Sequence, residues 1–275
     1  MQLISRKFAA GLTLAIASLA AQAGPVVGGF TNGGTVAVCD DCFTGPTTLG
    51  FTANYFGTSY NSTYVSNNGY VTFGAGQGIF TATGLTGAYA GLPIIAAFFS
   101  DVDTRGVGGG NVKYGTGTYA GANAFGVTWN AVGYFGSHVD KLNTFELILV
   151  DASAGNSAGD FDIYFNYNQI QWETGDASGG AGGFGGTSAS VGYARGNGVA
   201  GTYAQLNGSL VNGALLDGGV NSLVRNTNDG VTGQYKFSVR NGTVVTHELP
   251  EPTSLALVGL GLAAAAGLRR RKARA

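Results

Sequence analysis

The chain has 275 residues, of which only 11% are charged and 49 are glycine. Residues 24–249 contain seven basic and fourteen acidic side chains. This acidic excess excludes the phosphate-neutralising surface that nucleic-acid binding requires, so we expect no nucleic-acid partner. The same stretch is long enough to bury the core of one large domain.

The first 23 residues have the layout of a secretory signal peptide. Arg6 and Lys7 precede an uncharged apolar stretch, and Ala21 and Ala23 form an A-x-A cleavage signal. We therefore expect a signal-peptide helix, export through the Sec machinery and a mature chain that begins at Gly24. A retained membrane anchor is disfavoured, because the short apolar stretch runs directly into the cleavage signal.

The N-terminal segment 24–53 contains the chain's two cysteines, Cys39 and Cys42, separated by two aspartates. In an exported protein such a pair is predicted to form a disulfide that closes a small local loop. A redox role is disfavoured because reactive thiols need positive surroundings, and Asp40 and Asp41 supply the opposite charge. A metal site built on the two thiols is no better supported.

Residues 54–246 alternate short β-branched and aromatic runs with glycine and asparagine. This pattern predicts an all-β fold, a sandwich-like antiparallel domain. Asn68-Gly69 and Asn241-Gly242 are each flanked by such runs and predict two hairpin turns. The continuous apolar run 94–99 predicts a strand buried on both faces.

The segment 161–172 carries the clearest strand pattern in the chain. Alternate residues are aromatic or aliphatic as far as Tyr167, and then the phase changes, with Ile170 and Trp172 the next apolar residues. A β-bulge near Asn168-Gln169 explains the change. The following segment, 175–186, is rich in glycine and is expected to be a flexible loop, not a phosphate cradle.

The C-terminal segment 247–275 carries a second address. A structure-breaking motif precedes an uncharged stretch at 254–268, which is expected to be a short transmembrane helix, and a basic tail at 269–275. The defining residues are Pro250, Glu251, Pro252, Arg269, Arg270 and Arg271. A helix of this length spans only about 22 Å of a hydrocarbon core that is about 30 Å thick. The basic tail should stay cytoplasmic, which predicts a transient inner-membrane anchor.

This arrangement resembles the PEP-CTERM sorting signal. The resemblance implies recognition by an exosortase, removal of the tail and delivery to the cell surface or to an extracellular polymer. An ordinary tail anchor is the alternative, but the short apolar stretch and the tripeptide disfavour it.

Four blocks of the body, at 64–74, 93–105, 124–134 and 143–175, resemble the nidogen-like (NIDO) domain in the order of that family. Phe99 departs from the family's usual tryptophan. The resemblance implies an extracellular module that acts in matrix association or cell adhesion, with matrix proteins as candidate partners. Extracellular polysaccharide is a separate candidate partner, because exposed tyrosine rings and asparagine amides suit a sugar ring. It supplies no reaction and no ligand-binding residues.

Asp101 and Asp103 form the best candidate binding site, because two carboxylates at a strand end are suitable Ca²⁺ ligands. The pattern is not an EF-hand, since Arg105 and Val112 stand where ligands are needed. The alternative is that one of the two aspartates pairs with Arg105. Asp40, Asp41, Asp160 and Asp162 are weaker versions of the same idea. No other cofactor is expected.

Enzymatic chemistry has little support in the sequence. Ser137, His138 and Asp140 are too close in sequence to form a triad, and His138 is interpreted as a loop residue. Glu146 and Glu173 are the candidate glycosidase pair, although Glu146 fits the polar side of a strand. We therefore predict a non-enzymatic, exported surface or matrix protein with an adhesive or structural role. An exopolysaccharide-binding module is the alternative, and a secreted hydrolase is less favoured.

Overall fold

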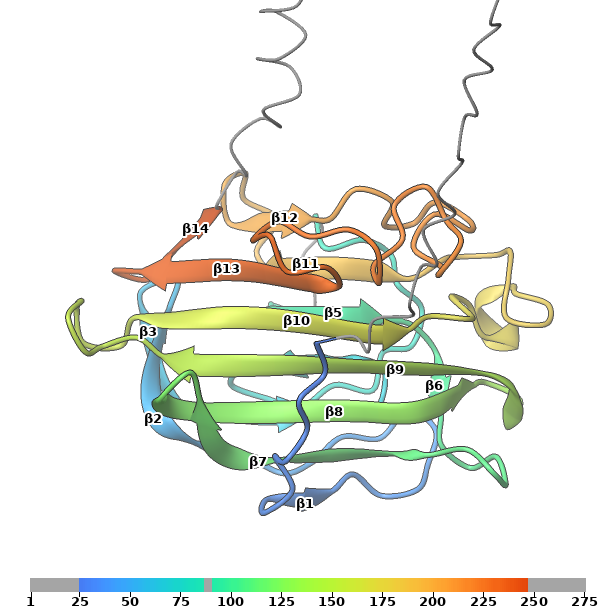
Figure 1. Cartoon of the computed structure of the whole chain (residues 1–275), viewed down its shortest axis with the longest axis horizontal. Helices are drawn as coiled ribbons and strands as arrows, with labels where there is room; N and C mark the ends of the chain where they lie inside the picture. The colour runs from blue at the N-terminus through green and yellow to red at the C-terminus, as the bar shows by residue number, and fades with distance from the viewer. Residues whose placement is uncertain (1–24, 87–90, 247–275) are drawn as a thin grey trace, which may run out of the picture.

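The computed structural model describes residues 25–86 and 91–246, which form two antiparallel β-sheets (Figure 1). The strands are β1 (Gly34–Thr35), β2 (Thr47–Tyr55), β3 (Thr58–Val65), β4 (Tyr70–Thr72), β5 (Ile94–Phe99), β6 (Val102–Asp103), β7 (Asn111–Tyr119), β8 (Ala122–Tyr134), β9 (His138–Asp151), β10 (Phe161–Gln169), β11 (Ser190–Ala194), β12 (Tyr203–Gln205), β13 (Gln234–Arg240) and β14 (Thr243–Thr246). The one helical element among the described residues is a 3₁₀ turn at Asp176–Ser178. The predicted all-β antiparallel fold is confirmed.

The larger sheet has the order β1-β7-β8-β9-β10-β13-β14, with β6 paired to β8, and the smaller has the order β12-β11-β5-β4-β3-β2. Figure 1 shows the larger sheet in front of the smaller one. The described part of the N-terminal segment 24–53 contributes β1 to the larger sheet and most of β2 to the smaller one.

Aromatic side chains from both sheets fill the space between them. Phe98 of β5 lies 5.4 Å from the ring of Phe145 on β9 and meets Trp172 edge-on at 5.7 Å. Trp129 of β8 stacks on Phe145 at 5.0 Å. Each such ring stabilises the fold by about 1.5–3 kcal/mol through burial, and the offset and edge-on geometries add to this.

Strand β5 is buried on both faces, as the sequence predicted. Ile95, Ala97 and Phe98 belong to the core between the sheets, while Ile94 and Phe99 pack on the other side. Ala97 and Phe98 are consecutive but both face the core between the sheets. The register between β5 and β11 shifts beside them, which indicates a β-bulge.

Both predicted hairpin turns are present. Asn241 and Gly242, with φ values of 50° and 77°, connect β13 to β14, which is the backbone that a two-residue turn between twisted strands requires. Asn68-Gly69 lies in the turn between β3 and β4. The predicted bulge in β10 is also present, between Tyr167 and Gln169.

The predicted strand at 161–172 is three residues too long, because β10 ends at Gln169. Beyond the bulge, the backbone N–H groups bond to side chains instead of to a neighbouring strand. Gln171 and Trp172 both donate to Oδ1 of Asn143, and Ile170 donates to Oδ1 of Asp217.

The predicted signal peptide, with its cleavage residues Ala21 and Ala23, and the predicted C-terminal sorting segment, 247–275, lie outside the described residues. In the part of the chain that the structure describes, no helix has the length and apolar character needed to cross a membrane.

Gly69 is a sharp test of the packing between the β3–β4 turn and β5. Its φ is +83°, and a Cβ atom there would overlap the carbonyl oxygen of Phe98. Gly57 has almost the same φ, +82°, but open space around it. We expect Gly57→Ala to cost about 1 kcal/mol, from backbone strain alone, and Gly69→Ala to cost about 3 kcal/mol or more. Urea denaturation measures both, and equal costs would contradict the packing described here.

Candidate functional site

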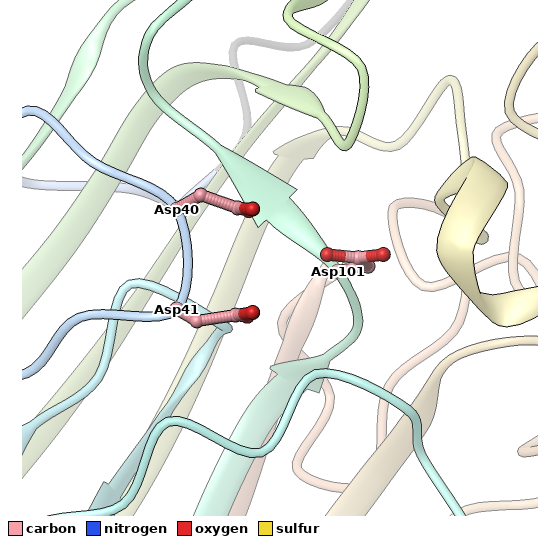
Figure 2. Close-up of side chains that lie close together, drawn as sticks. All are labelled: Asp40, Asp41 and Asp101. Atoms are coloured by element: carbon pink, nitrogen blue, oxygen red, sulfur yellow. The ribbon is translucent and has the colours of Figure 1, made fainter.

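Three carboxylates meet where the chain leaves β5 and enters β6. Asp101 lies in the connection between these strands, whereas Asp40 and Asp41 come from a loop some sixty residues earlier. One oxygen of each lies within 4.8 Å of the other two. Figure 2 shows the side chains of Asp40 and Asp41 pointing toward Asp101. We call these three residues the acidic site.

The loop that carries Asp40 and Asp41 is closed by a disulfide between Cys39 and Cys42. Thr104 fastens the loop to the body, because its backbone N–H donates to the carbonyl of Cys39 at 3.0 Å and its hydroxyl accepts from the Cys39 N–H at 2.9 Å. Asp40 also forms an isolated β-bridge with a residue of β6. The loop that carries the two aspartates is therefore fixed by the disulfide and by its hydrogen bonds with Thr104.

The turn between β3 and β4 forms hydrogen bonds with the acidic site and with β6. Asn68 donates from Nδ2 to Oδ1 of Asp41 at 2.8 Å and accepts from the N–H of Val102 through its own Oδ1 at 2.9 Å. Asn67 donates to the carbonyl of Val102 at 2.7 Å. Asn68, which indicated a turn in the sequence, thus also orients the carboxylate of Asp41.

Asp101 is 1% exposed, and neither of its carboxylate oxygens has a hydrogen-bond partner among the described residues. Gly175 packs directly against it, where any Cβ atom would overlap the carboxylate. Burial, followed by the charges of Asp40 and Asp41, raises the pKa of Asp101 to about 7.

The pKa values of Asp40 and Asp41 are also raised. Burial and the neighbouring Asp41 raise the pKa of Asp40 to about 6, although Arg105 approaches one of its oxygens at 3.1 Å and opposes the shift. Burial also raises the pKa of Asp41, against the hydrogen bond from Asn68. The acidic site therefore concentrates negative charge that the surrounding protein only partly compensates.

Asp103, which the sequence grouped with Asp101, has a different environment. Its carboxylate accepts from the backbone and side chain of Arg105, at 2.7–2.9 Å, and from the Ser137 N–H at 2.9 Å. Burial acts to raise the pKa of Asp103, but these hydrogen bonds outweigh it and lower the pKa. The alternative interpretation, pairing with Arg105, describes Asp103. Asp101 instead faces Asp40 and Asp41, which the sequence offered only as weaker candidates.

The interpretation of His138 as a loop residue is wrong, because it is the first residue of β9. Its Nε2 lies 2.9 Å from Oδ2 of Asp176, and its ring stacks on Tyr134. Among the described residues, Ser137 bonds to Asp103 rather than to His138.

Glu146 and Glu173 are both buried but lie in separate hydrogen-bond networks. Glu146 accepts from the N–H groups of Val27 and Gly28, in the N-terminal segment that covers the outside of the larger sheet. Glu173 accepts from the N–H of Gly213, and burial raises its pKa. The two share no hydrogen-bond partner in the described part of the chain.

An all-β sandwich with a disulfide-closed loop at one end has the construction of an extracellular module. The chain belongs to the nidogen-like domain family, which it matches over residues 61–241. Residues 248–272 match the PEP-CTERM protein-sorting motif, which implies exosortase-dependent export to the cell surface. Both resemblances drawn from the sequence are confirmed.

The curated relatives include alpha-tectorins of three vertebrates. The chain is 32% identical to alpha-tectorin of Homo sapiens over 167 residues, 32% identical to that of Mus musculus over 168, and 30% identical to that of Gallus gallus over 167. Each match covers 52% of this chain but only 7–8% of the relative, so the chain spans less than a tenth of their length. No solved structure shows a significant similarity to the chain.

Opposite effects on stability are expected when Asp101 and Asp103 are each changed to asparagine. In a chelating buffer at about pH 8, Asp101→Asn removes a buried charge that has no partner and should stabilise the protein by a few kcal/mol. Asp103→Asn breaks a compensated pair and should destabilise it by about 3 kcal/mol.

The gain from Asp101→Asn should also depend on pH. Because the folded-state pKa of Asp101 is about 7, above its ordinary value of 3.8, stability falls as pH rises between these values. At about pH 5 the folded protein already holds the proton, so the advantage of asparagine should shrink. Urea denaturation at both pH values tests this, and destabilisation by Asp101→Asn at about pH 8 would contradict it.

Proposed function

We propose that this protein is an exported component of the cell surface or of an extracellular polymer, with an adhesive or structural role exerted through its nidogen-like domain. The observation that carries the proposal is the order of the two family matches, since the domain at 61–241 is followed almost at once by the sorting motif at 248–272. The chain thus combines an extracellular module with its own delivery signal.

In this proposal, the signal peptide 1–23 directs the chain to the Sec machinery and is cleaved after Ala23. The stretch 254–268 then holds the protein briefly in the inner membrane, with the basic tail 269–275 on the cytoplasmic side. An exosortase recognises the Pro-Glu-Pro motif at 250–252 and removes the tail. The domain, already outside the membrane, is released or retained at the surface.

Replacing Pro250, Glu251 and Pro252 together by alanine should block sorting. We expect the variant to accumulate in the membrane fraction with its C-terminal peptide intact, and cells carrying it to lose the surface attachment that the unaltered protein supports. Fractionation, mass spectrometry of both mature termini and an attachment assay measure these outcomes. His247→Ala, just before the matched segment 248–272, is the control and should be sorted normally.

Normal processing of the triple variant would refute exosortase sorting. Correct sorting of the unaltered protein, with attachment equal to that of cells lacking it, would refute the adhesive role alone.

Binding of an exopolysaccharide is the second candidate function, and a surface pocket of about 420 Å³ favours it. Phe184, 40% exposed, contributes an aromatic ring, and Lys141 places its Nζ 5.2 Å from the ring centroid. Asp140, Gln171 and Asp217 add carboxylate and amide groups to the lining. An aromatic face beside such polar groups suits a pyranose ring.

The glycine-rich loop 175–186, which carries Phe184, is held by several backbone hydrogen bonds. Ala181 and Phe184 exchange backbone hydrogen bonds, and Thr187 donates to the carbonyl of Ser178. Phe184 is therefore held in place beside the pocket, which lowers the entropic cost of binding a ligand there.

Phe184→Ala should reduce binding to the polysaccharide of the producing cell by at least about tenfold, because stacking on the exposed ring is lost. Phe43→Ala is the matched control, since Phe43 is a phenylalanine of similar exposure, 47%, outside the pocket. Co-sedimentation with the polysaccharide measures both. Equal binding by both variants would remove this pocket from consideration.

A further inference from the structure

The acidic site contains a feature that an ordinary surface cluster of aspartates lacks. Asp101 is 99% shielded from solvent, yet both of its oxygens are without a hydrogen-bond partner among the described residues, and Oδ1 of Asp40 is buried in the same condition. Buried carboxylate oxygens are normally satisfied, because leaving them unpaired costs several kcal/mol. These oxygens are therefore arranged for a ligand that accepts their electron pairs.

The spacing of the three carboxylates specifies the size of that ligand. One oxygen from each of Asp40, Asp41 and Asp101 lies within 4.8 Å of the others. A Ca²⁺ ion takes oxygen ligands at about 2.3–2.6 Å, so a single ion can contact oxygens up to about 5 Å apart. We propose that Asp40, Asp41 and Asp101 together bind one divalent cation, and that this cation is Ca²⁺.

The chemistry of the donors selects the ion. All three ligands are carboxylates, and hard oxygen donors favour Ca²⁺, Mg²⁺ or Mn²⁺ over Zn²⁺. The nearby sulfur atoms of Cys39 and Cys42 form a disulfide, so they offer no thiolate that would favour Zn²⁺. Mg²⁺ demands near-ideal octahedral geometry and sheds water reluctantly, whereas Ca²⁺ accepts irregular carboxylate sites. An affinity on the order of 0.1–1 mM, as in other extracellular modules, is expected.

Arg105 is the one cationic side chain that contacts the site within the described residues, and it does not fill it. Its guanidinium donates two hydrogen bonds to Asp103 and reaches only Oδ2 of Asp40, at 3.1 Å. The Arg105 side chain is 46% exposed, so water screens much of its charge. Oδ1 of Asp40 and both oxygens of Asp101 remain available to an ion.

The proposed cation would join a part of the chain that lies inside the family match to a part that precedes it. Asp101 lies inside the segment that matches the nidogen-like family, 61–241, whereas Asp40 and Asp41 precede it. The ion would therefore fasten the disulfide loop onto the end of β5, in addition to the hydrogen bond that Cys39 donates to Thr104 and the one that Asn68 donates to Asp41. Its removal would leave three repelling carboxylates at this junction.

Calorimetric titration and thermal melting of the purified full-length chain test the proposal. After dialysis against EDTA, CaCl₂ should bind with a stoichiometry of about one and, at roughly 10 mM, raise the melting temperature by about 5–10 °C. MgCl₂ at the same concentration should have a smaller effect. Asp101→Asn should abolish both the heat of binding and the shift, and Asp41→Asn should weaken the affinity at least about tenfold.

Asp151→Asn is the matched control, because Asp151 is the last residue of β9 and its side chain accepts a hydrogen bond from the N–H of Ser153. It should bind Ca²⁺ as the unaltered chain does. The proposal is overturned if the unaltered chain shows neither heat nor shift, or if Asp101→Asn retains both. Should Asp101→Asn fail to fold, retention of full affinity by both Asp40→Asn and Asp41→Asn overturns it equally.

Discussion

The fit of the Asn67-Asn68-Gly69 turn against the end of β5 is the constraint on which the rest of this structure depends. The turn meets the hydrogen-bonding needs of a buried backbone, since Phe98 donates to the carbonyl of Gly69 and Ser100 donates to the carbonyl of Asn68. Val102 then donates to the side chain of Asn68. Without the turn, the buried N–H groups of Phe98 and Ser100 would lose these partners, which folded proteins rarely tolerate.

The different fates of Asp101 and Asp103 follow from this arrangement. The turn fixes the backbone on both sides of Asp101, and the close approach of Gly175 confines its side chain. Asp103, two residues later, lies beside Arg105 and Ser137, which supply it with hydrogen bonds. Two chemically identical residues thus acquire pKa values shifted in opposite directions, solely from which groups the fold places around them.

Local features of this fold could be predicted from the sequence because their causes are local. The Asn241-Gly242 turn, the bulge after Tyr167 and the doubly buried β5 each depend on a few consecutive residues. The Asp103–Arg105 pair is similar, since its members are two positions apart. The meeting of Asp40 and Asp41 with Asp101 depends instead on how β1, β2 and the disulfide loop are folded back onto β6, which no short pattern encodes. The position of His138 was also misjudged. The turn at 135–137 is so short that β9 begins directly after it.

The acidic site also fits the order of events that the sorting signals imply. A disulfide such as Cys39–Cys42 forms in an oxidising compartment, so the loop that positions Asp40 and Asp41 is completed only after export. The carboxylates then come together where the chain folds, beside the asparagine turn that holds Asp41. Burying Asp101 is costly, because its carboxylate oxygens have no hydrogen-bond partner in the described part of the chain. Folding of the exported domain and assembly of the acidic site are therefore one coupled process, which is opposed first by the burial of the three carboxylates and then by their mutual repulsion.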